Sequence, residues 1–256
     1  MSVDRQPHVG LFVTCLVELF RPRVAAAARR LLEKAGCRVS VPRAQSCCGQ
    51  PAYNSGDRLA AQAMARQQIR ALECCDQVVV PSGSCAAMIA RHYPRLLAED
   101  PEWRARAETL AARTAELTAF LAARDAPPES LDGSSEPLTY HDGCSGLREL
   151  GIKAAPRRLL AACGGDSCLR EMADAERCCG FGGLFAVKSD AISCAIGRRK
   201  LDDAEASGAG LLVAGELGCL LHLAGLARRE GRTIRCRHVA EILAGMDDGP
   251  AIGEST

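Results

Sequence analysis

The tripeptide Cys-Cys-Gly occurs twice in this sequence, at residues 47–49 and 178–180. Each copy stands between two further cysteines, which lie 32 residues before and 37 after the first pair, and 34 before and 40 after the second. Differences of two and three residues fit within loops, so the pattern predicts two homologous halves. The four cysteines of the first half are Cys15, Cys47, Cys48 and Cys85, and those of the second are Cys144, Cys178, Cys179 and Cys219.

Four thiolates can hold either Zn²⁺ or an iron–sulfur cluster. Structural zinc sites usually take cysteine pairs separated by two to four residues, because that loop brings both sulfurs to one ion. Adjacent cysteines suit a cluster better, since they can bind different iron atoms. The spacing therefore favours one iron–sulfur cluster per half, and zinc stays possible in one of the two sites.

Short apolar segments lead directly into the single cysteines. Residues 9–14 and 77–84 run into Cys15 and Cys85, and residues 138–143 and 211–218 run into Cys144 and Cys219. These segments are typical of buried strands, and helical patterns at residues 22–35, 57–72 and 189–208 separate them. We expect an α/β fold with a small parallel sheet in each half and the cysteines at the carboxyl ends of its strands.

Two of these cysteines, Cys85 and Cys219, also lie where helices are expected to begin. Free N–H groups and the helix dipole at such a position favour thiolate over thiol.

The pattern also sets the domain boundaries that we expect. The first repeat covers residues 8–98 and the second covers residues 137–246. Residues 99–136 combine a charged helix over 102–124 with a segment of linker composition, and residues 247–256 have the composition of a disordered tail.

The composition limits the function further. The chain has 256 residues, 15 cysteines and a net charge of +1, so no basic surface field favours nucleic-acid binding. No signal peptide or membrane-spanning segment is indicated, which favours a cytoplasmic location. In that reducing compartment, patterned cysteines are metal ligands or redox groups more often than disulfides.

The other polar and sulfur-containing candidates have simpler interpretations. We interpret most of the seven remaining cysteines as small buried hydrophobic residues. His141 and Asp142 could form an acid–base pair, but we interpret them as residues that shape the loop before Cys144. No nucleotide-binding motif occurs, and the sequence assigns no catalytic residue.

The motifs SCCGQPAYNSG, PSGSC, YHDGC and RCCGFGGLFAVKSD resemble those of the cysteine-rich CCG-domain family, over almost the whole chain. This family includes the B subunit of heterodisulfide reductase and the iron–sulfur subunit of glycolate oxidase. The resemblance implies two iron–sulfur clusters bound by the eight patterned cysteines. The heterodisulfide reductase relatives end the motif in C-x-x-C, whereas this chain has Ser82 and Glu216 at the earlier position and so offers four cysteines per site. An ordinary four-iron cluster, or zinc in one half, fits that number.

The resemblance is strongest to the CCG proteins of lactate utilization. It implies an electron-transfer component of a multisubunit L-lactate oxidation system, a bacterial oxidoreductase, with companion subunits similar to lactate utilization proteins B and C. Two alternatives remain open. One is a thiol–disulfide reductase subunit, and the other is a zinc-stabilised scaffold without a redox role.

Overall fold

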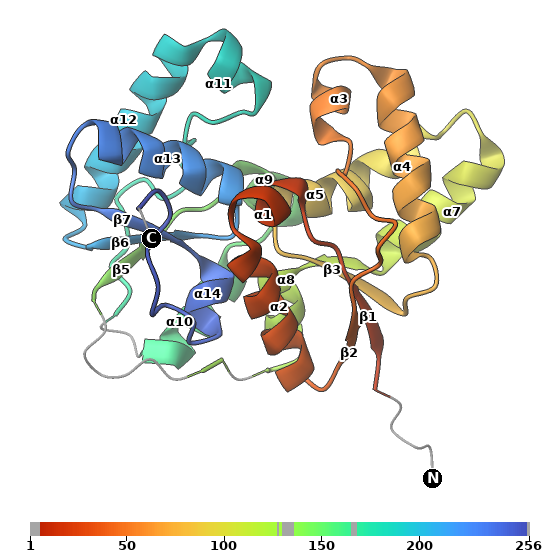
Figure 1. Ribbon diagram of the computed structural model, residues 1–256, viewed down its shortest axis with the longest axis horizontal. Helices are drawn as coiled ribbons and strands as arrows, with labels where there is room; N and C mark the ends of the chain where they lie inside the picture. The colour runs from red at the N-terminus through yellow and green to blue at the C-terminus, as the bar shows by residue number, and fades with distance from the viewer. Residues whose placement is uncertain (1–5, 127, 130–135, 165–167, 255–256) are drawn as a thin grey trace. The chain divides into compact units, whose positions relative to one another are not determined.

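The computed structural model describes residues 6–126, 128–129, 136–164 and 168–254. The chain forms two compact units, Met1–Ala126 and Pro127–Thr256. Each unit contains one parallel β-sheet with helices packed around it (Figure 1). The expected α/β fold with two repeats is therefore confirmed.

The sheet of the first unit has four parallel strands in the order β2-β1-β3-β4. The two central strands carry the apolar segments identified in the sequence, and Val9, Leu11 and Val79 on them are fully buried. The edge strands are shorter and more polar. The strands are β1 (His8–Leu11), β2 (Arg38–Ser40), β3 (Gln77–Val80) and β4 (Thr114–Glu116).

The helices of the first unit begin and end at the residues that the sequence marks. Pro22 is the first residue of the second helix, and Gly36 follows its end with a φ of 77°. The Asp57 carboxylate accepts the N–H of Ala60 and so caps the longest helix. The helical elements are α1 (Cys15–Phe20), α2 (Pro22–Lys34), α3 (Gln50–Asn54), α4 (Arg58–Leu72), α5 (Gly83–Ala87), the π-helical turn η1 (Met88–His92), α6 (Tyr93–Leu96), α7 (Pro101–Ala112) and α8 (Leu117–Ala123).

The sheet of the second unit has three parallel strands in the order β5-β6-β7. They are β5 (Leu138–Tyr140), β6 (Leu211–Ala214) and β7 (Arg235–His238). Among the described residues, a single parallel bridge between Leu138 and Leu169 stands where the first sheet has β2. The helices are α9 (Cys144–Leu150), α10 (Ala154–Gly164), α11 (Leu184–Lys188), α12 (Asp190–Ala206), α13 (Leu217–Arg229) and α14 (Val239–Leu243).

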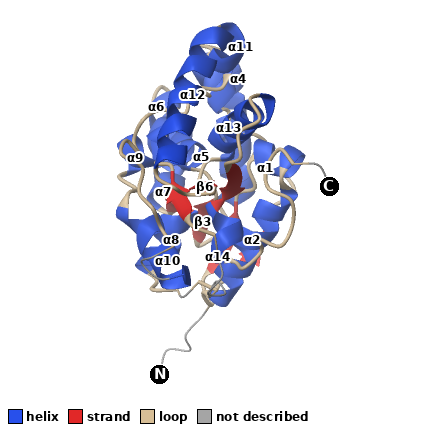
Figure 2. Ribbon diagram, turned by 90° about the vertical axis from the view of Figure 1, so that its left-hand side faces the viewer, coloured by secondary structure: helices blue, strands red, loops and turns tan. Residues whose placement is uncertain are grey.

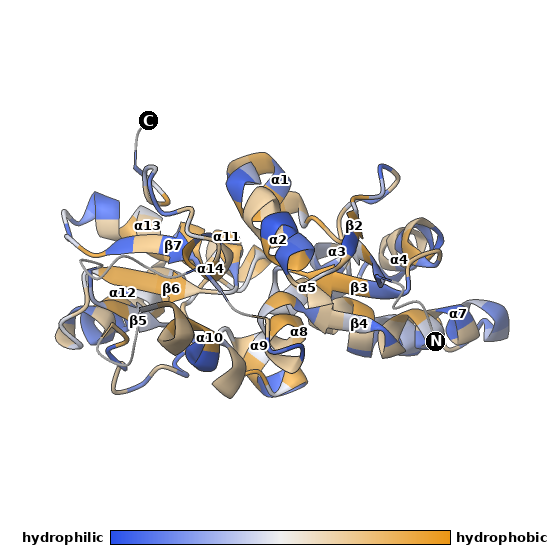
Figure 3. Ribbon diagram, turned by 90° about the horizontal axis from the view of Figure 1, so that it is seen from below, coloured by the Kyte–Doolittle hydropathy of each residue, from blue (hydrophilic) through white to orange (hydrophobic). Residues whose placement is uncertain are grey.

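Helices cover the strands in each unit, which explains the uninterrupted apolar sequence of the central strands. The strands are red and the helices blue in Figure 2. All four residues of β6 are buried, and this strand is coloured as hydrophobic in Figure 3. No helix within the described part of the chain is both long enough and apolar enough to cross a membrane.

Two segments differ from the sequence-based expectation. The helix expected over residues 102–124 is divided, because Thr114–Glu116 adds to the first sheet as β4 between α7 and α8. Part of the expected tail packs against the second unit. Ala251 and Ile252 are buried, and the N–H of Ile252 donates to the carbonyl of Cys236. Much of the expected linker, residues 127 and 130–135, lies outside the described residues.

Candidate functional site

The four patterned cysteines of the first unit converge at the carboxyl end of its sheet. Cys15 begins α1 directly after β1, and Cys85 lies in α5 directly after β3. Cys47 and Cys48 lie in the loop before α3. The sulfurs of Cys15 and Cys47 are 3.7 Å apart, and those of Cys48 and Cys85 are 3.3 Å apart.

Short polar side chains cap the N-termini of the two helices that carry Cys15 and Cys85. Thr14 Oγ1 accepts the N–H of Val17, and Ser82 Oγ accepts the N–H of Cys85. Ser82 precedes Cys85 by three residues, and it is 2% exposed. Its hydroxyl therefore acts as a helix cap beside the site.

The first-unit thiols strongly affect one another's ionisation. Hydrogen bonds donated by Cys15 and Cys48 lower the pKa of Cys47, while the same contacts raise the pKa of Cys15 and Cys48. Burial raises the pKa of Cys48 further. One thiolate in the group is thus stabilised by neutral neighbours, because several adjacent negative charges would repel one another.

The second unit repeats this arrangement. Cys144 begins α9, which follows β5. Cys219 is the third residue of α13, which follows β6, just as Cys85 is the third residue of α5. Cys178 and Cys179 lie in the loop before α11. The sulfurs of Cys179 and Cys219 are 2.8 Å apart, and the charges of Cys144 and Cys178 raise the pKa of Cys219.

The surroundings of Cys219 favour the thiol over the thiolate. The hydrogen bond from Cys179 lowers the pKa of Cys219, but burial and the charges of Glu216, Cys144 and Cys178 raise it by more. The expectation that the helix start favours thiolate is therefore wrong for this residue in the metal-free chain. A bound cation would supply the missing stabilisation, since metal ions displace thiol protons.

Backbone N–H groups point at the adjacent sulfurs. Gly180 donates to the sulfur of Cys178 at 3.3 Å, and Phe181 donates to that of Cys179 at 3.4 Å. Such N–H···S bonds stabilise negative charge on sulfur and tune the potential of iron–sulfur clusters.

The glycine of each Cys-Cys-Gly motif is required by the backbone. Gly49 has a φ of 85° and Gly180 a φ of 89°, a left-handed conformation that glycine adopts without strain. A Cβ on Gly180 would also lie 2.3 Å from the carbonyl oxygen of Ser193. The motif glycine therefore lets this loop turn back closely against α12.

His141 joins the second-unit cysteines, a position that sequence reasoning did not assign to it. The candidate ligand atoms of His141, Cys179 and Cys219 all lie within 4.8 Å of one another. Burial and the charge of Lys200 lower the pKa of the imidazole to about 3, so it is neutral at physiological pH. A sequence signal existed, because His141 lies at the end of a strand that leads into a patterned cysteine.

Asp142 does not form an acid–base pair with His141. Its two carboxylate oxygens accept hydrogen bonds from Arg157 at 2.8 and 2.9 Å, and its backbone N–H donates to the Ala175 carbonyl. Lys200, which is also buried, donates to the carbonyls of Asp174 and Ala175. These contacts fasten the strand end to the segment before Cys178, as expected of loop-shaping residues.

Tyr93 is a further site neighbour that the sequence did not reveal. Its hydroxyl is buried and donates to the carbonyl of Cys48 at 2.8 Å. It follows the π-helical turn η1, and such turns occur often at functional sites. No motif marks a lone tyrosine, so only the folded chain shows this contact.

The seven other cysteines differ in how far they are buried. Five of them are buried, which fits small hydrophobic residues, whereas Cys194 is half-buried and Cys74 is exposed. The buried five are Cys37, Cys75, Cys163, Cys168 and Cys236.

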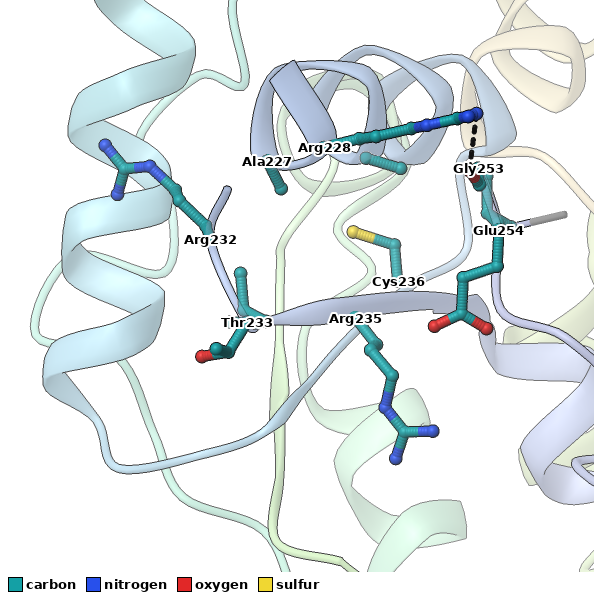
Figure 4. A pocket seen from close by; sticks show the side chains of 11 residues that line it. Ala227, Arg228, Arg232, Thr233, Arg235, Cys236, Gly253 and Glu254 are labelled. Carbon is teal, nitrogen blue, oxygen red and sulfur yellow. Dashed lines mark hydrogen bonds between the residues drawn. The ribbon is translucent and has the colours of Figure 1, made fainter. Parts of the chain in front are cut away.

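A cavity of about 430 Å³ lies in the second unit between the end of α13 and the start of β7 (Figure 4). Arg228, Arg232 and Arg235 line it, but each is already paired. Arg228 donates to the Gly253 carbonyl, Arg232 pairs with Asp202, and Arg235 pairs with Glu136. None of the patterned cysteines lines this cavity, so we place no function there.

The donor atoms of both cysteine groups are of the kind that binds metals. Two sulfurs bound to one tetrahedral ion at about 2.3 Å lie about 3.8 Å apart. The 3.7 Å between Cys15 and Cys47 matches this spacing, whereas the 2.8 Å between Cys179 and Cys219 would have to widen. Each group combines buried sulfurs with sulfurs nearer the surface, and in the second unit backbone donors point at them. These are suitable surroundings for a metal ion or an iron–sulfur cluster.

A family model described as a cysteine-rich CCG domain matches this chain twice, at residues 9–90 and 138–224. These matches cover both cysteine groups. The chain belongs to the CCG cysteine-rich family.

Within the CCG family, the chain is similar to proteins named lactate utilization protein A. It is 46% identical over 238 residues to the one from Geobacillus kaustophilus and 44% identical over 237 residues to the one from Shouchella clausii. Each alignment covers 92% of this chain and 98% of the relative. A Bacillus cereus protein named lactate utilization protein A 2 is 40% identical over 236 residues.

A solved structure has a similar fold. A hypothetical protein from Helicobacter pylori matches 99% of this chain with a TM-score of 0.67 and 12% sequence identity. The chain spans 53% of the length of that protein. At this identity the similarity shows the fold alone.

Proposed function

We propose that this chain is the iron–sulfur electron-transfer component of a multisubunit system that oxidises L-lactate. The observation that carries the proposal is the convergence of four cysteines in each unit, in a chain 40–46% identical to lactate utilization proteins A over 92% of its length. The companions would resemble lactate utilization proteins B and C, and the location would be cytoplasmic.

In this proposal the two cysteine groups hold one cluster each. Cys15, Cys47, Cys48 and Cys85 would bind the first, and Cys144, Cys178, Cys179 and Cys219 the second. A bound iron–sulfur cluster supplies reversible one-electron oxidation and reduction. The chain contributes buried thiols, N–H donors to sulfur and rigid strand ends that hold the ligands in place.

The metal content of the purified protein tests the first half of the proposal. The protein should be purified without oxygen and analysed for iron, acid-labile sulfide and zinc, with EPR spectra of the reduced and oxidised forms. We expect iron and sulfide at both sites. A protein that is fully active without iron would contradict the proposal.

Growth on lactate tests the second half. Deletion of the gene should abolish growth on L-lactate, and the wild-type gene should restore it. A gene with Cys48→Ala and Cys179→Ala should fail to restore growth, whereas Cys74→Ala, at an exposed cysteine outside the pattern, should succeed. Normal growth of the deletion strain, in the absence of a second gene of this kind, would refute the assignment.

A zinc-stabilised scaffold is the second candidate, and one observation favours it in the second unit. Three donors within 4.8 Å of one another, two thiols and an imidazole, could share a single tetrahedral ion. A colourless protein with about one zinc per unit and no iron would support this candidate.

A further inference from the structure

We propose that His141 is an additional ligand of the metal centre in the second unit, so that this centre has a nitrogen donor and the first centre has none. The inference rests on the proposed function only in requiring a metal ion or cluster at the second site. It concerns a residue outside the repeated cysteine pattern, and it makes the two centres chemically different.

The position of the ring is the first argument. A ring nitrogen of His141 lies within 4.8 Å of the sulfurs of Cys179 and Cys219. Ligand bonds of about 2.0 Å to nitrogen and 2.3 Å to sulfur place donor atoms on one ion less than about 4.5 Å apart. Small side-chain adjustments would therefore bring all three donors onto one metal atom.

The absence of other partners for the ring is the second argument. His141 is 1% exposed, and neither ring nitrogen makes a hydrogen bond of good geometry with a described residue, although the ring lies near the Ala175 carbonyl, which already accepts from Asp142 and Lys200. Leaving a buried polar group unpaired destabilises the folded chain. Coordination of a metal would satisfy one nitrogen and explain why a polar ring is retained there.

The polar groups around the ring already have other partners. Asp142 is bound by Arg157 through both of its oxygens. Lys200 donates to the carbonyls of Asp174 and Ala175. The backbone of His141 is itself held, because its N–H donates to the Val213 carbonyl at 2.8 Å. The imidazole is thus kept in place beside the sulfurs.

The first unit provides an internal comparison. Phe12 occupies the same register, since its N–H donates to the Val79 carbonyl at 2.9 Å, and Val79 and Val213 each lie six residues before a patterned cysteine. Phe12 is fully buried and has no atom that can bind a metal. The second site thus offers five donors and the first site four.

The difference in donors implies a difference in potential. A neutral imidazole adds less negative charge to a centre than a thiolate does, and replacement of cysteine by histidine raises the potential of iron–sulfur centres. If His141 takes the place of one thiolate on an iron atom, the second centre should have the higher potential of the two.

The experiment compares wild-type protein with His141→Phe, which copies the residue of the first unit, and with His222→Phe as the control. His222 is a half-buried histidine on α13, the helix that carries Cys219. All three proteins are labelled with ¹⁵N-histidine and purified without oxygen. Iron centres are then examined by pulsed EPR, and zinc centres by X-ray absorption, which detects a bound imidazole.

We expect a histidine nitrogen signal in the wild type and in His222→Phe, and its loss in His141→Phe. His141→Phe should also release metal from one site at least about tenfold more readily to a chelator. A wild-type protein that holds metal but gives no histidine signal would overturn this inference and leave the proposed function standing. A signal that persists in His141→Phe would overturn it as well.

A protein that holds neither iron nor zinc would refute the proposed function, but His141 can still be tested. Cobalt(II) is then titrated into metal-free wild type and His141→Phe, and binding is followed by the visible absorption of the thiolate complex. Binding at least about tenfold weaker in His141→Phe supports the inference. Equal affinity in the two proteins overturns it.

Discussion

At the scale of the residue, the eight patterned cysteines are distinguished from the other seven by gathering in two groups of four at the carboxyl ends of strands. Cys48 and Cys179 are the buried members of their motifs, and each lies beside the sulfur of the last cysteine of its unit. The hydrogen bonds with Cys47 and Cys85, and then burial, raise the pKa of Cys48. At Cys179 the hydrogen bond with Cys178 lowers the pKa, but the hydrogen bond with Cys219 and burial raise it by more, so both thiols are protonated at neutral pH in the metal-free chain. Binding of a metal must displace these protons, which couples metal uptake to pH.

Substitution of these two cysteines should affect one metal centre at a time. Cys48→Ser should remove the metal of the first unit and Cys179→Ser that of the second, because the ligands of each group come from a single unit. Iron and zinc per chain measure the outcome, with Cys74→Ser as the control. Loss of both centres in either variant would show that the sites are not independent.

The ion pair between Asp142 and Arg157 should contribute strongly to stability. The Asp142 side chain is fully buried, and that of Arg157 is 19% exposed. Arg157→Met would leave a buried carboxylate without its partner, at a cost of about 3 kcal/mol in the free energy of unfolding. Urea denaturation measures the change.

An exposed pair provides the comparison for this substitution. Arg29 and Glu33 lie one turn apart on α2 with both side chains well exposed, so Arg29→Met should cost less than about 1 kcal/mol. Equal effects of the two substitutions would show that the burial of Asp142 is energetically unimportant.

At the scale of the element, both sites are built from the same join between a strand and a helix. A buried strand ends, a short connecting segment follows, and a helix begins with a cysteine in its first turn. The Cys-Cys-Gly loop then reaches the same edge of the sheet from a separate segment. Ligands placed on strand and helix ends are held more rigidly than ligands on free loops.

The loop glycine of the second unit gives a test of this geometry. Gly180→Ala would combine a left-handed backbone with a Cβ 2.3 Å from the Ser193 carbonyl oxygen, so the loop must move. We expect a loss of stability greater than about 2 kcal/mol, because the clash adds to the backbone strain, and loss of metal from the second site. Metal content and thermal unfolding measure these effects.

Gly36 separates the backbone effect from the steric effect. It has a φ of 77°, but nothing lies within 4 Å of its Cβ position. Gly36→Ala should therefore cost only about 1–2 kcal/mol and leave both sites loaded. If Gly180→Ala behaves in the same way, close contact with α12 does not position the cysteines.

At the scale of the whole molecule, two units of one design have diverged in detail. The first sheet has an extra edge strand, and the second site has a histidine where the first has Phe12. The residue three positions before the last patterned cysteine also differs, being the capping Ser82 in one unit and Glu216 in the other, whose charge raises the pKa of Cys219. The repeat thus supplies two similar frames in which different side chains surround the cysteines.

The stability of the whole chain should fall at alkaline pH, in part through Cys236. Burial raises the pKa of this thiol from 9.0 to about 12. Its contribution to stability is therefore complete below pH 9 and is lost as the pH rises toward 12, because only the unfolded thiol ionises. Each pH unit in that range costs about 1.4 kcal/mol for one such group.

Urea denaturation of metal-free, reduced protein at pH 8, 9 and 10 measures this effect. Cys236→Ala should reduce the loss of stability between pH 9 and 10 by about 1 kcal/mol. Cys74→Ala should keep the wild-type pH dependence. An unchanged pH dependence in Cys236→Ala would show that the buried thiol does not contribute.

Much of the fold followed from local patterns. The central strands are continuous apolar runs, and α2, α4 and α12 have marked ends, so their positions agree with expectation. The sequence did not predict the edge strands β2, β4 and β7, because they are short and largely polar. Val39 is the apolar residue of β2, and Cys236 is that of β7. Residues 102–124 read as one helix because alanine and charged residues suit a helix, and only pairing with β3 makes Thr114–Glu116 a strand.

The sequence by itself determined the repeat and the eight cysteines, because spacing along the chain is preserved when a unit is duplicated. Only the tertiary structure decided which other groups surround the sulfurs. Tyr93, His141 and Arg157 come from elements far from the Cys-Cys-Gly motifs in the chain, and no local periodicity marks them. Their positions follow from how the strands pair and how the helices pack on each sheet. Both depend on contacts between residues that are distant in the chain.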